Sequence, residues 1–412
     1  MDHKLQWCLE RHMSYPRLTT LAARNFRSLE DVKVPLGALT VLVGPNGSGK
    51  TNVLNVMRFL ASTVRFDLAA AVGEWGGMPR ISRQSAAKTS QSVTIQVSGQ
   101  LTQHSSDSAL DEYKLQFRST PLGALTRSED FTFKRTKGRG RRITVSGRHF
   151  EIGPEGPTSD GEPARRRLAT AQTTGLSTLP RLADDEGGEG IRVLAEFLSS
   201  IRVLEPDMQE ARRPSHMVPG RLADDAGNLA SALHRLSTTD GEFFESLLGD
   251  MRYCLPGLDS IEFVPVGGPG RAVAVALRER GLSSPVELAD ASFGTVRLLA
   301  LLTALHEPDP PPFTAIEEVD HGLHPYALDV LVDRLRQASR LSQIMVTTHS
   351  PTFVNRLKPS ELVVCARNME TGASVIPYSD SRQLARVQHS SDLRLGELWF
   401  AGALGGVPDS VA

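Results

Sequence analysis

The sequence has little of several features that would narrow its class. Only three of its 412 residues are cysteines, and Cys8, Cys254 and Cys365 lie far apart. That spacing argues against a disulfide framework and against a zinc knuckle. No uncharged apolar run approaches the roughly 20 residues that a membrane-spanning helix requires. Met1–Ser14 is charged throughout and lacks the apolar core of a signal peptide. We therefore expect a cytoplasmic protein with no membrane part.

An excess of charge of either sign is also missing. Lysine and arginine total 46 and aspartate and glutamate 47, which gives a formal net charge of -1. Any contact with nucleic acid must therefore come from a local basic patch. The 40% hydrophobic and 23% charged residues are ordinary for a globular protein. A chain of this length can form one large domain or two lobes.

Hydrophobic patterns in the first half predict a mixture of strands, one helix and long loops. The predicted loops are polar, glycine-containing segments at Gly73–Ser92 and Gly153–Gly190. A helix is predicted over Lys50–Ala61. The predicted strands are Leu18–Phe26, Ala38–Val43, an alternating segment at Val93–Val97, Tyr113–Arg118, Phe131–Thr136 and Ile143–Gly147.

The second half changes to an α/β rhythm, which is typical of a largely parallel sheet covered by helices. The alternation is helix Gly294–His306, strand Phe313–Glu317, helix Tyr326–Ser339 and strand Gln343–Thr348. Before it lie predicted helices at Ile191–Ser200, Asn228–Leu236 and Phe243–Cys254, then strands at Ile261–Val266 and Ala272–Leu277. We expect an α/β fold divided at 15–152, 153–260 and 261–412, with the middle part forming a smaller, partly helical lobe.

A phosphate-binding loop is the strongest motif. Gly44-Pro45-Asn46-Gly47-Ser48-Gly49-Lys50-Thr51 matches G-x-x-x-x-G-K-[ST] between a predicted strand and a predicted helix. Glycines let backbone N–H groups wrap phosphates, and the helix N-terminus adds partial positive charge. Lys50 can reach the β- and γ-phosphates of ATP, and the Thr51 hydroxyl can ligate Mg²⁺.

A pair of carboxylates follows the predicted strand Phe313–Glu317. An acid at a strand end can hold Mg²⁺ through water, and the next acid can orient the attacking water. We assign Glu317 to the metal and Glu318 to the water. Two surface glutamates would give the same pattern, but the phosphate-binding loop elsewhere in the chain favours the catalytic reading.

Four segments together resemble the ABC-type ATPases related to SMC, RecF and OLD proteins. Ile316–Pro325 is similar to their Walker B and D-loop segment, and Ser292-Phe293-Gly294-Thr295 to their signature motif. Thr347–Pro351 resembles their switch-histidine segment, and Asn25-Phe26-Arg27-Ser28 their opening strand. Two positions depart from the commoner pattern: Glu317 stands where Asp is usual and Phe293 where Gly is usual.

The resemblance implies a P-loop NTPase head with a mixed sheet that binds ATP and Mg²⁺ and hydrolyses ATP as a homodimer. Ser292 and Gly294 would bind the γ-phosphate held by the partner subunit, and His349 would hydrogen-bond the γ-phosphate in its own subunit. Arg27 could reach the nucleotide or be a surface arginine at a strand end. The candidates for a Q-loop residue are Gln91, Gln96 and Gln100, and His321 and His324 are expected to pack within their loop.

Possible partner sites are fewer. Six of the nine residues of Lys134–Arg142 are basic. We read this segment either as a hairpin tip that contacts DNA backbone or as a solvated turn. Arg165–Arg167 forms a smaller cluster for which solvation is favoured. The amphipathic segment Leu395–Phe400 is expected to pack on the core, with docking of a partner as the alternative.

Two absences separate relatives. Between the phosphate-binding loop and Ser292 there is no sustained heptad pattern, which excludes a long coiled-coil arm. That long interval also disfavours a transporter subunit. After His349 there is no Asp-x-Asp pair that would hold nuclease metals. We expect an ATPase without its own nuclease that acts on DNA in repair, chromosome maintenance or anti-phage defence. The alternative is an ATP-dependent switch that controls a protein effector, such as a nuclease or toxin.

Overall fold

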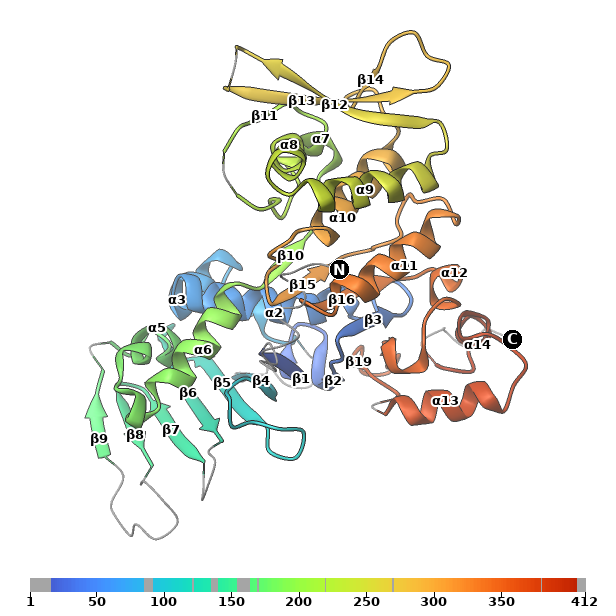
Figure 1. The fold of residues 1–412 in the computed structure, drawn as a ribbon. Helices are drawn as coiled ribbons and strands as arrows, with labels where there is room; N and C mark the ends of the chain where they lie inside the picture. The colour runs from blue at the N-terminus through green and yellow to red at the C-terminus, as the bar shows by residue number, and fades with distance from the viewer. Residues whose placement is uncertain are drawn as a thin grey trace. The chain divides into compact units, whose positions relative to one another are not determined.

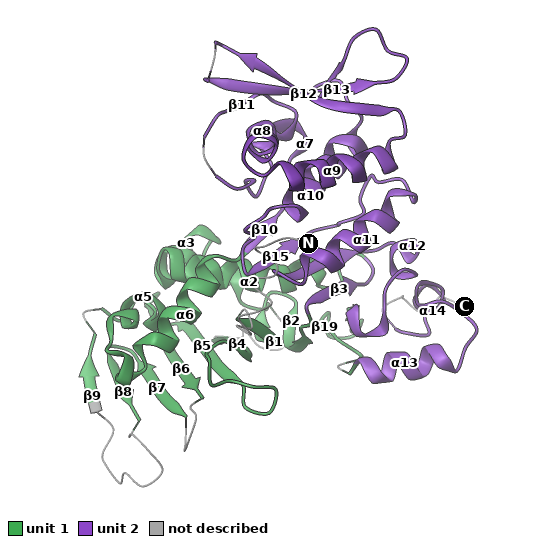
Figure 2. Ribbon diagram, viewed as in Figure 1, with its two compact units in different colours: residues 1–37, 46–201, 365–380 green, residues 38–45, 202–364, 381–412 purple. Residues whose placement is uncertain are grey.

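The computed structural model describes residues 16–84, 92–120, 122–134, 140–153, 164–168, 170–218, 220–268, 270–378 and 380–405. The chain divides into two compact units, each assembled from three stretches of sequence (Figure 2). Unit 1 comprises residues 1–37, 46–201 and 365–380, and unit 2 comprises 38–45, 202–364 and 381–412. The boundary at 45/46 falls inside the phosphate-binding loop, so this loop joins the two units.

Unit 1 is built on a ten-stranded sheet, antiparallel except at the β19–β2 pair. Inward-facing residues alternate with outward-facing ones, as in β4 and β5, because one face is covered. The cover includes α2, whose Phe59 ring stacks on Phe117 of β5 at 5.3 Å between centroids. In sheet order the strands are β18 (Ala366–Arg367), β19 (Ser374–Val375), β2 (Leu29–Pro35), β1 (Arg17–Phe26), β4 (Ser92–Gln100), β5 (Asp111–Ser119), β6 (Leu125–Phe133), β7 (Arg141–Ser146), β8 (His149–Ile152) and β9 (Ala164–Arg167).

Both segments of unit 1 that were predicted as loops contain short helices or strands. The segment predicted as the loop Gly73–Ser92 contains α4 (Met78–Ile81), and Gly153–Gly190 contains β9, α5 (Gly175–Thr178) and two 3₁₀ turns. These short elements escape periodicity arguments because each is fixed by tertiary contact. Leu176 of α5, for example, is fully buried. The other helices are α2 (Lys50–Arg65), α3 (Leu68–Glu74) and α6 (Gly188–Ser199).

The strand predicted to run to Thr136 ends earlier. β6 stops at Phe133, and the Lys134 backbone N–H donates to the Asp111 side chain at 2.7 Å instead of continuing the ladder. The predicted α2 is confirmed, and it extends one turn further than its pattern indicated. β2, which pairs with β1, was not predicted at all.

Unit 2 contains a five-stranded, all-parallel sheet, which confirms the predicted α/β architecture (Figure 1). Every residue of β3, β15 and β16 is buried, as expected for a sheet covered on both faces. The strand order is β10 (Arg202–Leu204), β15 (Phe313–Ile316), β16 (Gln343–Thr348), β3 (Leu39–Val43) and β17 (Leu362–Val364). The adjoining helices include α10 (Phe293–Leu305) and α11 (Ala327–Ala338).

A second, four-stranded sheet in unit 2 packs with α8 and α9, and α10 contacts both helices. Its strands are β11 (Ser215–His216), β12 (Leu258–Val266), β13 (Ala272–Glu279) and β14 (Val286–Glu287). The remaining elements of the unit are α7 (Met208–Ala211), α8 (Leu229–Thr239), α9 (Gly241–Cys254), α12 (Pro351–Val354), the 3₁₀ helix η3 (Pro359–Glu361), α13 (Ser381–His389) and α14 (Leu395–Phe400). In the described part of the chain, α2 is the longest helix at 16 residues, and none of the helices found there has the length and apolarity to cross a bilayer.

Candidate nucleotide-binding site

Three neighbouring strands of the parallel sheet carry the predicted motifs at their carboxyl ends. β15 leads into Glu317, β16 into His349 and β3 into Gly44. In register, Ile316 lies beside Val346, and Thr348 lies beside Val43. Because parallel strands end at the same edge of a sheet, unit 2 brings the acidic pair, the predicted switch histidine and the start of the phosphate-binding loop to one edge.

The rest of the phosphate-binding loop lies in unit 1 and turns through two left-handed glycines, Gly47 at φ 78° and Gly49 at φ 103°. Lys50 is the first residue of α2 and is buried, whereas Thr51 in the same turn is exposed. The Ser48 hydroxyl is buried with no hydrogen-bond partner among the described residues. These features fit a nucleoside triphosphate with Mg²⁺: the glycines let the backbone turn around the phosphates at a helix N-terminus, beside a lysine and an exposed threonine.

Side chains from distant parts of unit 1 support this loop. A Cβ on Gly49 would lie 2.1 Å from the Ser374 hydroxyl of β19, so glycine is required there. The Ser374 and Ser28 hydroxyls are 2.6 Å apart, and the Asn52 amide donates to Ser28 at 2.7 Å. The predicted opening segment Asn25–Ser28 therefore contacts the loop's support through Ser28. Ser374 was missed because nothing in the local sequence marks it.

Lys50 also acts electrostatically on a buried thiol. Burial raises the pKa of Cys365 to about 12, and the nearby positive charge of Lys50 opposes that shift. Cys365 precedes β18, so the hairpin β18–β19 begins beside the lysine of the loop. A thiol with so high a pKa stays protonated and is not a reactive nucleophile.

The acidic pair is held by its backbone. Glu318 has a left-handed backbone with φ 45°, which is uncommon for a residue other than glycine. Its N–H donates to the Thr347 hydroxyl at 2.8 Å, which ties β15's end to β16. The surrounding hydrogen bonds maintain the strain at this position, and the Glu318 side chain is 41% exposed.

Arg297 is a second support that sequence reasoning missed. From α10 its guanidinium donates to the carbonyls of Glu317 at 3.0 Å and Glu318 at 2.7 Å. Burial lowers the pKa of Arg297, and the charges of Glu318 and Asp320 oppose the shift. An arginine within an apolar helical run reads as a surface residue. The sequence offered one indication that Arg297 supports the site: it lies five residues after Ser292, on the helix that begins at the predicted signature.

The predicted signature segment begins α10. The Ser292 hydroxyl is exposed and accepts the Thr295 N–H at 3.1 Å, so it caps the helix. A Cβ on Gly294 would lie 2.6 Å from the Gly322 carbonyl, and one on Gly322 would lie 2.6 Å from the Phe293 ring. Phe293, unusual for the motif, thus packs on the segment that follows the acidic pair.

The three histidines near this edge differ. His349 is exposed directly after β16. His324 accepts the Tyr326 N–H at 3.2 Å within its loop, as expected. The His321 ring lies 3.4 Å from the Glu318 carboxylate and 5.6 Å from the Phe293 ring. Within the described residues, no group of three His, Cys, Asp or Glu side chains is arranged to hold a metal ion.

Arg27 and the glutamine candidates lie in unit 1. The Arg27 guanidinium stacks on Trp75, with its carbon 4.8 Å from the ring centroid. Gln96 pairs with Glu112 and Gln100 with Asp107 along the antiparallel sheet. Gln91 lies outside the described residues. The roles of these residues towards a nucleotide stay predictions.

Only part of the basic segment Lys134–Arg142 can be described. Residues 135–139 lie outside the described part of the chain. Arg141 is buried and donates to the carbonyls of Gly153 and Asp185, so its role is structural. Arg142 is exposed and pairs with Asp130 at 3.1 Å.

Two further predicted partner segments have intramolecular contacts. In the cluster Arg165–Arg167, Arg165 pairs with Glu151 and Arg166 with Glu186. The segment Leu395–Phe400 forms α14, whose Gly396 N–H donates to Asn355 at 2.8 Å. Trp399 is buried and Phe400 is exposed, which favours packing on the core for most of this helix.

The chain belongs to the family described as "AAA domain, putative AbiEii toxin, Type IV TA system", whose sequence profile matches residues 39–355. This match contains every core motif from the phosphate-binding loop to the switch-histidine segment. Together with the fold, it identifies the chain as an ABC-type ATPase of the SMC/RecF/OLD-like group.

Individual relatives are distant. The chain is 24% identical over 392 residues to an OLD nuclease from Thermus scotoductus, covering 90% of this chain and 66% of that protein. It therefore spans just under two thirds of that relative's length. Two solved structures share the fold. One is an SMC head bound to the C-terminal winged-helix domain of ScpA, with TM-score 0.53, 15% identity and coverage of 90% and 100%. The other is an SMC head with an extended coiled coil bound to the C-terminal domain of ScpA from Pyrococcus furiosus, with TM-score 0.54, 13% identity and coverage of 91% and 99%.

Proposed function

We propose that this chain binds Mg-ATP at Gly44–Thr51 and hydrolyses it. The observation that carries the proposal is the single sheet edge at which β3, β15 and β16 end. Lys50 would neutralise the β- and γ-phosphates, and the Thr51 hydroxyl and Glu317 would hold the metal. Bound Mg²⁺ would neutralise charge on the transferring phosphate.

Glu318 would accept a proton from the attacking water. Hydrogen bonds with Thr347 and Arg297 fix the Glu318 backbone, so its carboxylate is presented from a defined position. His349, exposed at the end of β16, would donate to the γ-phosphate and respond to its presence.

We further propose that two copies share each nucleotide. Ser292 and Gly294 stand at the exposed N-terminus of α10, where the helix dipole and backbone N–H groups favour a phosphate. In a head-to-tail dimer they would contact the γ-phosphate that the partner's loop binds. Contact between Phe293 and Gly322 couples this segment to the one after Glu318, within one subunit.

The dimer is proposed to act on DNA. Support comes from the distant likeness to an OLD nuclease, an enzyme of nucleic acid. A second candidate is control of a protein effector, which the family description favours because it refers to a toxin and a toxin–antitoxin system. ATP-dependent DNA binding by the purified chain distinguishes the first from the second.

Mixing two inactive variants tests shared catalysis. Ser292→Arg should bind ATP but turn over poorly, and Lys50→Ala should not bind ATP. Mixed dimers have one composite site lacking both halves and one with both intact. We expect the mixture to hydrolyse ATP faster than the sum of its separate components, whereas a mixture of Lys50→Ala with Ser284→Arg, a control in an exposed loop, simply retains the control's activity. A mixture no faster than its parts would contradict shared sites.

A further inference from the structure

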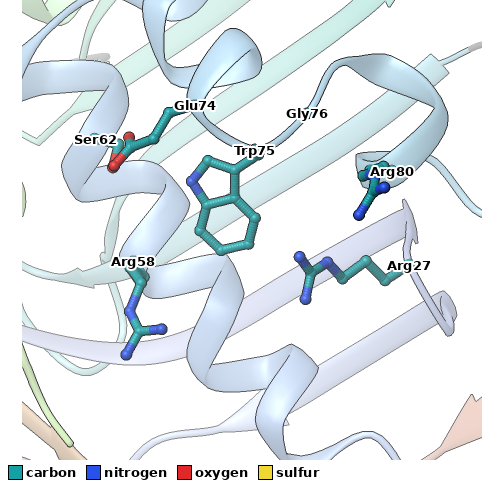
Figure 3. A pocket seen from close by; sticks show the side chains of 7 residues that line it. All are labelled: Arg27, Arg58, Ser62, Glu74, Trp75, Gly76 and Arg80. Carbon is teal, nitrogen blue, oxygen red and sulfur yellow. The ribbon is translucent and has the colours of Figure 1, made fainter.

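Unit 1 contains an open pocket that none of the predicted motifs explains except through Arg27. Its volume is about 550 Å³, and it is lined by Arg27, Arg58, Ser62, Glu74, Trp75, Gly76 and Arg80. Figure 3 shows the three arginines around the Trp75 indole, with Arg58 and Ser62 on α2. Three of the seven lining residues carry guanidinium groups and one carries a carboxylate.

The Trp75 ring orients one of these cations, Arg27. The indole packs edge-on against Phe26 and Phe59, with centroids 6.2 and 5.8 Å away, which fixes the ring. Arg27 stacks on that ring at 4.8 Å, and its Nε is buried with no hydrogen-bond partner among the described residues. A stacked guanidinium keeps its in-plane donors available for an anion.

Gly76 leaves the space that the Arg80 side chain occupies at the pocket. A Cβ on Gly76 would lie 2.7 Å from the Arg80 Cδ, and the Gly76 backbone is left-handed with φ 80°.

Burial, and then the charge of Arg58, lower the pKa of Arg27. Two like charges so close that one disfavours the other are stabilised when an anion binds between them.

The pocket is separate from the phosphate-binding loop. Arg58 follows Lys50 by eight residues on α2, which corresponds to about 12 Å of helix rise. Phosphates bound at a helix N-terminus lie beyond that end, not along the flank where Arg58 and Ser62 lie. A phosphate held in this pocket would therefore belong to a different ligand, or a different part of a ligand, from one held at the helix N-terminus.

We propose that this pocket binds the phosphate backbone of DNA through Arg27, Arg58 and Arg80. The inference rests on the proposed action on DNA and locates a contact surface for it in unit 1. Contacts of this kind carry no sequence information, so binding is independent of base sequence and strongly dependent on salt. Trp75 serves as the platform that holds Arg27 in place.

The test uses the full-length protein and a fluorescent DNA duplex with Mg-ATP, on a Glu318→Gln background that retains ATP. Arg58→Gln/Arg80→Gln removes two pocket cations and leaves Arg27 in place. The matched control, Arg24→Gln/Arg118→Gln, removes two exposed arginines from β1 and β5 of the same unit. We expect the pocket variant alone to lose roughly tenfold or more in DNA affinity at low salt. The slope of log affinity against log salt should become shallower by about 0.9 for each arginine–phosphate ion pair that the variant removes.

Each other result is decisive. If Glu318→Gln binds DNA and the pocket and control variants bind it equally, the pocket inference is wrong and the proposed function stands. A pocket variant that instead loses affinity for fluorescent ATP without DNA would show that the pocket serves the nucleotide, which also overturns the inference. Absence of DNA binding by the Glu318→Gln protein itself would overturn both the pocket and the DNA-acting function.

Discussion

The two large sheets of this protein divide the work differently. The five-stranded parallel sheet of unit 2 is buried on both faces, and its loops carry the acidic pair, the predicted switch histidine and the start of the phosphate-binding loop. The ten-stranded sheet of unit 1 is almost entirely antiparallel, and of the family-like segments it carries the opening segment Asn25–Ser28 at the end of β1. Parallel strands all end at one edge, so residues distant in sequence converge there. Antiparallel strands end alternately at both edges and spread their end residues apart.

The contrast extends to buried charge. At the parallel edge, the hydrogen bonds that Arg297 donates within the described residues go to backbone carbonyls and leave the carboxylates of Glu317 and Glu318 for chemistry. Inside the antiparallel sheet, Arg127 and Glu129 pair at 3.2 Å with both side chains inaccessible to solvent. The first arrangement positions a reactive group, and the second fills a structural role. Substitutions can test whether this division of function and stability is real.

The largest effect is expected at the phosphate-binding loop. Lys50→Ala removes the ammonium group predicted to contact the β- and γ-phosphates, so ATP affinity should fall about a hundredfold or more. Titration with a fluorescent ATP analogue measures this affinity. Lys33→Ala, at an exposed position on β2, is the control and should bind normally. Unchanged affinity in Lys50→Ala would refute the assignment of the loop.

A smaller loss, of hydrolysis and not of ATP binding, is expected from a change at Arg297, which supports the acidic pair. Arg297→Met keeps the apolar stem but leaves two carbonyls unpaired and releases the Glu318 backbone. Hydrolysis should fall about ten- to hundredfold, because small displacements of a catalytic group are costly, while ATP affinity stays within about twofold. Steady-state hydrolysis and nucleotide titration separate the two quantities. Arg340→Met, at an exposed position in unit 2, should change neither, and equal hydrolysis by Arg297→Met and wild type would remove Arg297 from the account.

The smallest effect on ATP binding is expected from the pair in the antiparallel sheet. Arg127→Met should cost about 3–5 kcal/mol of folding stability at neutral pH, because it leaves the Glu129 carboxylate buried without its cation. Burial already raises the pKa of Glu129, and the charge of Arg127 opposes that shift. Without Arg127 the pKa rises further, so folding takes up a proton. The stability deficit should then shrink as pH is lowered from 7 towards 5.

Denaturant unfolding at the two pH values measures this deficit. The double variant Arg127→Met/Glu129→Gln is the matched control, since it removes both charges and should recover much of the lost stability. ATP affinity should match the wild type in both variants. A strong loss of ATP affinity in folded Arg127→Met would break the proposed division between the sheets.

The same contrast explains how much the sequence could predict. The phosphate-binding loop, the strand before Glu317 and the strand before His349 were predictable because buried parallel strands are short apolar runs that end in polar residues. α2 followed from periodicity, although it extends beyond its predicted end, and α10 followed from a continuous apolar run after Ser292. The fold class was confirmed for these reasons.

What sequence reasoning missed depends on contacts between distant residues. Arg297 sits in an apolar helix, and apart from its position after Ser292 the sequence gives no sign that it reaches the residues that follow β15. Ser374 lies more than three hundred residues from its hydrogen-bond partner Ser28. The short helix α5 was predicted as loop because distant residues hold it, as the burial of Leu176 and the hydrogen bond from the Gly175 N–H to Glu129 show. In the segment Lys134–Arg142, the composition gave no sign that Arg141 is buried and donates to two backbone carbonyls.

The central claim is that a dimer binds ATP at the edge where β3, β15 and β16 end and hydrolyses it with Glu318. Light scattering of Glu318→Gln with Mg-ATP tests this claim most directly. Glutamine keeps the size and hydrogen bonding of glutamate but cannot accept the proton, so hydrolysis should fall about 10²- to 10⁴-fold while ATP remains bound. We predict a dimer at micromolar protein that reverts to monomer when ATP is removed. An ATP-loaded Glu318→Gln protein that stays monomeric across this range would contradict the shared site.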